Sequence, residues 1–197
     1  MRTETNLPVT VRRIVLTGFM GAGKSTIGAL LAQRLGWRFL DTDAIIEART
    51  GATIAQLFAQ RGETAFRELE TETIRNHSHT ESQVLALGGG AIEAEATRQA
   101  LTRLEHACIV FLDAPLEVMV ARCLAHPAAV ERPVLADREQ LAARLTARLP
   151  HYRQAHLTVA TSKLDPQAVA DHILEALQDR CAAPRVTTPQ KEGVATS

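Results

Sequence analysis

The segment with the clearest chemical meaning is GFMGAGKS, residues 18–25. Its glycines let backbone N–H groups curl around phosphate oxygens, because no Cβ blocks the approach. Lys24 supplies a positive charge for the β- and γ-phosphates, and Ser25 offers its hydroxyl to Mg²⁺. An apolar run precedes the segment and a helical pattern follows it, which is the context of a phosphate-binding P-loop. We therefore predict that the chain binds a nucleoside triphosphate with Mg²⁺ as cofactor; the alternative is a glycine-rich turn that binds nothing.

Two carboxylates, Asp41 and Asp43, follow the second β-like run and are separated by one residue. In an extended segment, side chains at this spacing project from the same face. Near a P-loop, one carboxylate would serve the Mg²⁺ shell and the other the hydroxyl that attacks the γ-phosphate. The alternative is an acidic N-cap of the next helix, which Asp43 could provide. Local sequence does not decide between them.

Further along, an arginine and three consecutive glycines are candidates for substrate contacts. Arg67 could clamp a carboxylate with its forked donors, although a surface i,i+3 pair with Glu70 is the interpretation that the local pattern favours. Residues 88–90 are all glycine and end an apolar run, so a ligand could touch the backbone there; a flexible turn is the alternative. Arg148 and Arg153 are weaker candidates for anion contacts.

The elements that must position these residues form an alternating pattern. Five short β-rich runs are separated by longer helical patterns, which predicts a parallel sheet with helices on both faces. These runs are 14–17, 38–40, 84–87, 108–112 and 157–160. The first helix should end at Gly36.

Two segments exceed what a plain α/β crossover needs. Helical patterns at 44–49 and 53–74 predict a substrate-binding insertion, residues 41–75, over the carboxyl ends of the strands. The second segment, 125–137, contains two prolines and small residues, which favours a mobile lid over an ordinary surface connection.

Composition limits the class of protein. The 197 residues suit one domain, and 22 basic against 22 acidic residues give a net charge of zero, so no overall field attracts nucleic acid or a membrane. No apolar stretch approaches the roughly 18 residues of a membrane span. Three cysteines indicate reduced thiols and a cytoplasmic protein. We expect a flexible extension at 1–11, a single domain at 12–180 and a disordered tail at 181–197.

The ordered motifs resemble those of the shikimate kinase family, within the P-loop enzymes that are similar to nucleoside monophosphate kinases. The resemblance covers about residues 12–177 and rests on GFMGAGKS, FLDTD, FRELE, LALGGG, ERPVL and RLPHY in that order. It implies an α/β fold with a five-stranded parallel sheet. It also implies transfer of the γ-phosphoryl group of ATP to the 3-hydroxyl of shikimate, a step of chorismate and aromatic amino-acid biosynthesis.

The resemblance also implies roles for matching positions. Asp43 would contact the reacting hydroxyl, Asp41 and Ser25 would serve Mg²⁺, and Lys24 and the lid residue Arg132 would neutralise charge on the transferring group. Contacts to shikimate would come from Asp43, Arg67, Gly89, Gly90, Arg148, Phe58 and Phe66, with the two arginines on its carboxylate. Contacts to the nucleotide would come from Gly21, Ala22, Gly23, Lys24, Ser25, Thr26, Arg122, Arg132 and Pro166, with Arg122 and Pro166 flanking the adenine.

One departure from the family pattern is visible in the lid. The common Arg-Pro-Leu-Leu is Arg132-Pro133-Val134-Leu135 here, which should alter packing without removing the cation.

Two other functions remain open. One is a related kinase that acts on gluconate or a nucleoside monophosphate. The other is a nucleotide-dependent switch or ATPase, with 108–113 as its Walker B-like strand. The guanine-reading Asn-Lys-x-Asp motif is absent, because neither Asn6 nor Asn76 is followed by Lys. We expect ATP and shikimate as partners and a monomer.

Overall fold

The computed structural model describes residues 11–125 and 137–182. Its centre is one sheet of five parallel strands in the order β2-β3-β1-β4-β5. The strands are β1 (Arg13–Thr17), β2 (Arg38–Asp41), β3 (Gln83–Ala86), β4 (Ala107–Asp113) and β5 (Leu157–Ala160). Every residue of β1 and β3 is buried, as expected where helices cover both faces of a parallel sheet. The predicted fold class is confirmed.

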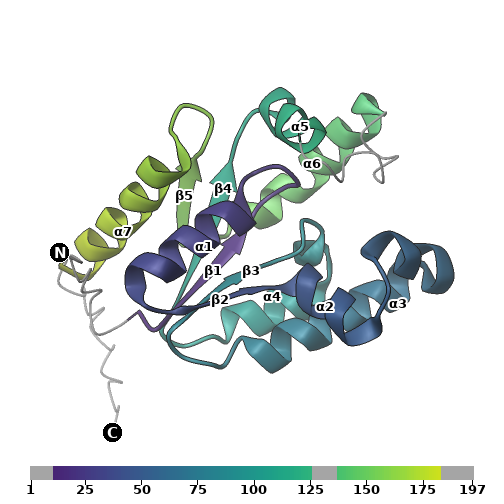
Figure 1. The fold of residues 1–197 in the computed structure, drawn as a ribbon, viewed down its shortest axis with the longest axis horizontal. Coiled ribbons are helices and arrows are strands. Elements are labelled where there is room, and N and C mark those ends of the chain that lie inside the picture. Colours follow the sequence, from purple (N-terminus) through teal and green to yellow (C-terminus); the bar gives the residue numbers. More distant parts are fainter. Residues whose placement is uncertain (1–10, 126–136, 183–197) are drawn as a thin grey trace, which may run out of the picture.

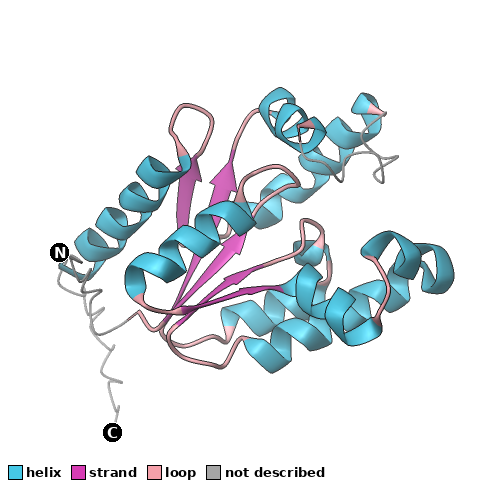
Figure 2. Ribbon diagram, in the orientation of Figure 1, coloured by secondary structure: helices cyan, strands magenta, loops and turns pink. Residues whose placement is uncertain are grey.

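Helices lie on both sides of this sheet (Figures 1 and 2). Helix α1 (Lys24–Leu35) begins in the P-loop and ends at Gly36, whose φ of 66° makes it the predicted left-handed cap. It packs beside α7 (Pro166–Ala182) in front of the sheet. Behind the sheet lie α4 (Glu95–Thr102) and α6 (Arg138–Tyr152), while α5 (Leu116–Leu124) follows β4.

The predicted insertion is a separate helical unit between β2 and β3, formed by α2 (Thr42–Thr50) and α3 (Ile54–His77). It extends to one side of the sheet (Figure 1). It has its own apolar cluster, built on Ile46, Leu57 and Phe66, apart from the main core. Helix α3 is interrupted at Gly62, where φ is 75°, a break that the sequence pattern did not predict.

The order of the strands places three loops together. Because β2, β3 and β1 are neighbours and parallel, the segments that follow them meet at one edge of the sheet. These segments are the start of α2, the glycines at 88–90 and the P-loop. A short 3-10 helix, η1 (Ala91–Glu93), continues from the glycines.

Several sequence-based expectations fall mainly outside the described residues. The extension at 1–11, the lid at 125–137 and the tail at 181–197 are of this kind, and they stay predictions. Within the described parts of the chain, Cys108 and Cys123 are buried and form no disulfide. None of the helices there combines the length and apolar character needed to cross a lipid bilayer.

Candidate active site

The P-loop is shaped by glycines that other residues would not replace. Gly21 and Gly23 have φ of 74° and 99°, in the left-handed region that disfavours side chains. A Cβ at Gly21 would also overlap the backbone carbonyl of Met119 in α5. The loop therefore keeps its shape only with glycine at this position, and its amides stay close to the helix N-terminus where phosphate binds.

Lys24 is held inside this loop. Its Nζ donates to the carbonyl oxygens of Gly18 at 2.8 Å and Phe19 at 3.0 Å. Burial lowers the pKa of Lys24, and the charges of Asp43 and Asp41 act in the opposite direction. An anion in the loop would add a counter-charge for the half-buried ammonium, so the geometry suits a phosphate group.

The two carboxylates after β2 have separate tasks. Asp41 Oδ2 accepts a hydrogen bond from Ser25 Oγ at 2.6 Å, and Asp41 Oδ1 accepts one from the Asp43 amide at 3.0 Å. Asp41 is thus the N-cap of α2, a role that the sequence had left open for Asp43. Since the P-loop serine bonds to Asp41 at the end of β2, this is the acidic group beside the predicted Mg²⁺ position.

Asp43 is free of the capping role and lies against the glycine segment. A Cβ at Gly88 would stand 2.7 Å from Asp43 Oδ1. Burial, followed by the charge of Asp41, raises the pKa of Asp43, while Lys24 opposes the rise. The carboxylate therefore sits in a half-buried position near Lys24, where it can accept a hydrogen bond from a substrate hydroxyl.

The backbone of the three glycines is held in place by hydrogen bonds, so the segment is not a flexible turn. The Gly88 amide donates to Thr42 Oγ1 at 2.9 Å, and the Gly89 carbonyl accepts a hydrogen bond from the hydroxyl of Tyr152. A Cβ at Gly90 would collide with the guanidinium of Arg67. This close approach explains why the segment has no side chains.

Arg67 and Arg148 come together from α3 and α6. Nη2 of Arg67 lies 3.0 Å, and Nη2 of Arg148 lies 2.8 Å, from the same oxygen, Glu93 Oε2. Each arginine also has a buried Nε with no hydrogen-bond partner among the described residues. Two converging guanidinium groups with unsatisfied donors form a site for a carboxylate or a phosphate.

Aromatic rings pack against the guanidinium groups of both arginines. The Arg67 guanidinium lies 5.8 Å from the ring centre of Phe58 and 5.5 Å from that of Phe66, and the guanidinium of Arg148 lies 5.4 Å from that of Phe19. Phe58 and Phe66 were predicted to line the substrate pocket; the structure places them directly beside Arg67.

Glu70 is the second partner of Arg67, and it is buried. The predicted i,i+3 pair exists, with Arg67 Nη1 at 2.7 Å from Glu70 Oε2, but the Glu70 side chain is 1% exposed, so the expected surface location was wrong. Burial raises the pKa of Glu70 to about 7 against the opposing charge of Arg67. Between pH 4.5 and about 7, Glu70 therefore stays protonated in the folded protein, whereas the unfolded chain would release this proton.

This proton makes stability depend on pH. Folding takes up a proton between pH 4.5, the ordinary value for glutamate, and about 7, so the contribution to stability is full below this window and is lost as pH rises through 7. In Glu70→Gln this dependence should vanish, and the variant should gain up to about 3 kcal/mol relative to wild type between pH 5 and pH 8. Urea denaturation at both values measures the difference. Glu68→Gln, exposed on the same helix, is the control; a pH-independent difference between Glu70→Gln and wild type would contradict the assignment.

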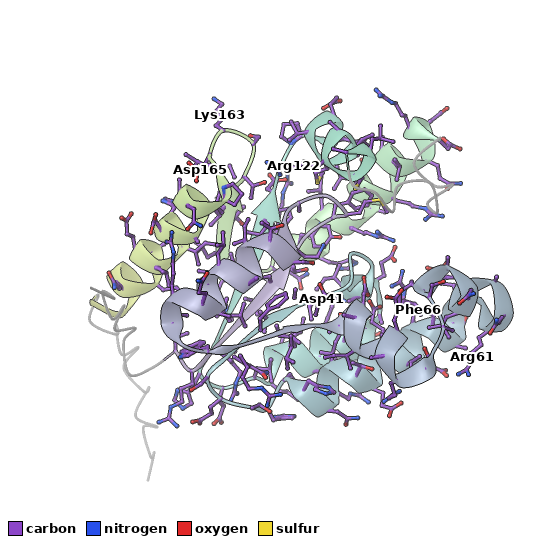
Figure 3. The ribbon with its side chains drawn as sticks, in the orientation of Figure 1. Asp41, Arg61, Phe66, Arg122, Lys163 and Asp165 are labelled. Carbon is purple, nitrogen blue, oxygen red and sulfur yellow. The ribbon has the colours of Figure 1, made fainter. Side chains whose placement is uncertain are left out.

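Two of the predicted nucleotide contacts, Arg122 in α5 and Pro166 at the start of α7, lie on the opposite side of the P-loop from the insertion. In Figure 3, Asp41 lies near the centre, with Phe66 to its right and with Arg122 and Asp165 above it and to its left. Arg122 donates to the Thr161 carbonyl at 2.6 Å and to the Gly21 carbonyl at 3.4 Å, which ties α5 to the P-loop. Pro166 borders a cavity of about 600 Å³ that also includes Thr26. Arg132 lies outside the described residues.

Three residues that shape this site were not predicted from the sequence. Thr42 and Tyr152 anchor the glycine segment, and Glu93 joins the two arginines. Tyr152 stands within the RLPHY motif, which was a usable signal. Glu93 had none beyond its place three residues after Gly90.

The arrangement of oxygen ligands is compatible with Mg²⁺. In the described ranges, no group of three or more His, Cys, Asp or Glu side chains could hold a metal by itself. Mg²⁺ commonly keeps several waters and binds through one or two protein oxygens together with substrate phosphates. The Ser25 hydroxyl and the Asp41 carboxylate supply oxygens of that kind beside the P-loop.

Comparison with known proteins decides the family. The sequence model of the shikimate kinase family matches residues 20–178. The chain belongs to the shikimate kinase family. The shikimate kinase of Geobacter sulfurreducens is 44% identical over 171 residues, which cover 85% of this chain and 92% of that protein. The shikimate kinase of Symbiobacterium thermophilum is 40% identical over 171 residues, covering 85% of this chain and 97% of its own.

A solved structure supports the same assignment for the fold. Shikimate kinase from Acinetobacter baumannii, in complex with shikimate, superposes with a TM-score of 0.80 at 36% identity. The match covers 87% of this chain and 95% of that chain. The sequence resemblance to the shikimate kinase family is therefore confirmed over nearly the whole described part.

Proposed function

We propose that the protein phosphorylates shikimate, transferring the γ-phosphoryl group of ATP to the 3-hydroxyl to give shikimate 3-phosphate and ADP. The observation that carries this proposal is the pair Arg67 and Arg148, whose Nη2 atoms lie within 3.0 Å of one carboxylate oxygen at the same sheet edge as the P-loop. Family membership and the shikimate complex of the Acinetobacter baumannii relative support it. The reaction would serve chorismate and aromatic amino-acid biosynthesis in the cytoplasm.

The proposed mechanism is mainly positioning and charge stabilisation. The transition state of phosphoryl transfer is loose, with charge spread over the equatorial oxygens. Lys24 and the P-loop amides would stabilise that charge, joined by Arg132 from a lid over the site. Asp43 would accept a hydrogen bond from the 3-hydroxyl and orient it, and it need not be a strong base. Lid closure would exclude water, which otherwise competes as acceptor.

Binding of the metal and the nucleotide follows from the groups around the P-loop. Ser25 would ligate Mg²⁺ and Asp41 would support its shell, and the ion would neutralise charge on the β- and γ-phosphates. The adenine would lie between Arg122 and Pro166. Arg122 already contacts the P-loop backbone at Gly21, so nucleotide and loop would be ordered together.

The remaining contacts concern the acceptor. The carboxylate of shikimate would bind Arg67 and Arg148, and its ring oxygens would approach the backbone at Gly89 and Gly90. Phe58 and Phe66 would line the shikimate pocket, and their rings would pack against the guanidinium group of Arg67. We expect a single kinase domain that acts as a monomer.

Arg67→Lys should weaken the binding of shikimate but leave the binding of ATP nearly unchanged. The compact ammonium of lysine cannot make the paired donor fork, so the Kd for shikimate should rise about tenfold or more while the Kd for ATP changes less than about twofold. Isothermal titration calorimetry with each ligand measures this. Equal weakening of both ligands would argue against a carboxylate clamp.

A coupled ADP assay with MgATP and a panel of acceptors tests the proposed function. Shikimate should start ADP release, and gluconate, quinate and nucleoside monophosphates should be much poorer acceptors. Preference for gluconate or a nucleoside monophosphate would indicate a related kinase. Strong ATP hydrolysis without any acceptor would favour a nucleotide-dependent switch.

A further inference from the structure

A carboxylate of the chain itself occupies the space between the two arginines. Glu93 Oε2 lies 2.8 Å from Arg148 Nη2 and 3.0 Å from Arg67 Nη2. The arginine side chains are only 7% and 16% exposed, whereas that of Glu93 is 36% exposed. The two guanidinium groups are therefore fixed inside the site, and the carboxylate reaches them from its border.

The backbone of Glu93 is anchored at that border. It is the last residue of η1, and its amide donates to the Gly90 carbonyl at 3.0 Å. Arg98 Nη1 donates to the Glu93 carbonyl at 2.6 Å. These two hydrogen bonds hold the backbone, while the side chain borders an open groove of about 680 Å³ between α3 and α4. Rotation about its own bonds would carry the carboxylate from the arginines into water.

The charge on Glu93 makes it an effective counter-ion. Burial favours the neutral form, but the hydrogen bond and charge of Arg148, together with the charge of Arg67, prevail and lower the pKa of Glu93. The group is therefore ionised at neutral pH. It balances two cations that would otherwise face each other in a partly dry site.

The arginines do not need Glu93 to keep their positions. Arg67 is bonded to the buried Glu70 and stacked on two phenylalanine rings. Arg148 lies over Phe19, and its Nη1 points to the Gly89 carbonyl at 3.4 Å. Since both guanidinium groups have other supports, loss of the Glu93 charge should leave them in place and free for another anion.

We propose that Glu93 is an internal competitor of the acceptor's carboxylate. Its side chain fills the anion site between the two arginines, and an acidic acceptor must displace it. The inference rests on the proposed function only in taking the acceptor to be a carboxylic acid. When the competent state is a fraction of the population, the apparent Kd rises by the inverse of that fraction. An uncharged acceptor does not compete for the arginines, so its Kd should depend little on the charge of Glu93.

Glu93→Gln tests this, because glutamine keeps the size and removes the charge. Calorimetry would use shikimate and cyclohexanecarboxylate, a carboxylate probe without hydroxyls, with the methyl ester of shikimate as the uncharged comparison. The variant should bind both acids about three to ten times more tightly and the ester no more than about twofold more tightly. The KM for shikimate should fall by a similar factor with kcat nearly unchanged.

Glu63→Gln is the matched control. Glu63 contacts the same Arg67 Nη2 at 3.2 Å, but its side chain is 64% exposed and does not reach Arg148. The Kd values of Glu63→Gln for shikimate and cyclohexanecarboxylate should stay within about twofold of those of wild type.

The outcomes separate the inference from the proposed function. Weaker binding of the acids by Glu93→Gln would make Glu93 a positioning residue, and unchanged binding would make it a bystander; either result overturns the inference. If cyclohexanecarboxylate bound more tightly to Glu93→Gln while neither protein phosphorylated shikimate, the inference would stand and the proposed function would fail.

Discussion

Asp43→Asn is expected to lower kcat about 100-fold or more while MgADP binding stays near that of wild type. Asp43 lies against Gly88 at the sheet edge shared with the P-loop, where a carboxylate can orient the attacking hydroxyl. Asparagine has nearly the same shape but a weaker acceptor. The N-cap of α2 is Asp41, so the substitution should not unravel the helix. Steady-state kinetics and calorimetry with MgADP measure the two effects.

Two further variants serve as comparisons for Asp43→Asn. Glu175→Gln removes a carboxylate from the exposed face of α7 and should leave kcat unchanged. Asp41→Asn should instead raise the Mg²⁺ concentration needed for half-maximal activity, since Asp41 bonds to Ser25. Near-normal turnover by Asp43→Asn would remove Asp43 from the reaction.

Lys24→Met should slow the chemical step about 1,000-fold. Methionine retains much of the length of the side chain and removes the ammonium, which the P-loop carbonyls of Gly18 and Phe19 hold beside the predicted phosphate position. A preorganised cation in a dry site is worth far more to the transition state than the same charge in water. Single-turnover measurements at saturating ATP isolate this step from product release.

Arg34→Met is the comparison for Lys24→Met. It removes a cation from the last turn of the same helix, where Arg34 pairs with Asp171 of α7 far from the P-loop. Its single-turnover rate should match that of wild type. An equally fast reaction in Lys24→Met would show that the ammonium contributes nothing to phosphoryl transfer.

The fold was predictable because its signals are local and agree with one another. Apolar runs marked all five strands, and the bounds of β5 were predicted correctly as 157–160. The left-handed cap at Gly36 followed from residue type alone. The break in α3 at Gly62 was missed, since the apolar positions on either side fit one continuous helical pattern.

The site was predictable where a residue belongs to a spaced motif. The P-loop, Asp41 and the glycines at 88–90 are of this kind. The family resemblance implied separate roles for Asp41 and Asp43, but local sequence left the helix cap open, because only the fold shows which amide is in reach. The burial of Glu70 also depends on tertiary contacts. So does the convergence on Glu93 of Arg67 and Arg148, which come from two helices distant in sequence.

In the proposed reaction, a carboxylate held by Arg67 and Arg148 presents a hydroxyl at Asp43 to a phosphate in the P-loop. A crystal structure with shikimate and MgADP tests this arrangement most directly. We expect the carboxylate between the two guanidinium groups, the 3-hydroxyl at Asp43 facing the β-phosphate, and Glu93 turned out of the site. Shikimate bound with its carboxylate away from both arginines, or far from the nucleotide, would contradict this arrangement.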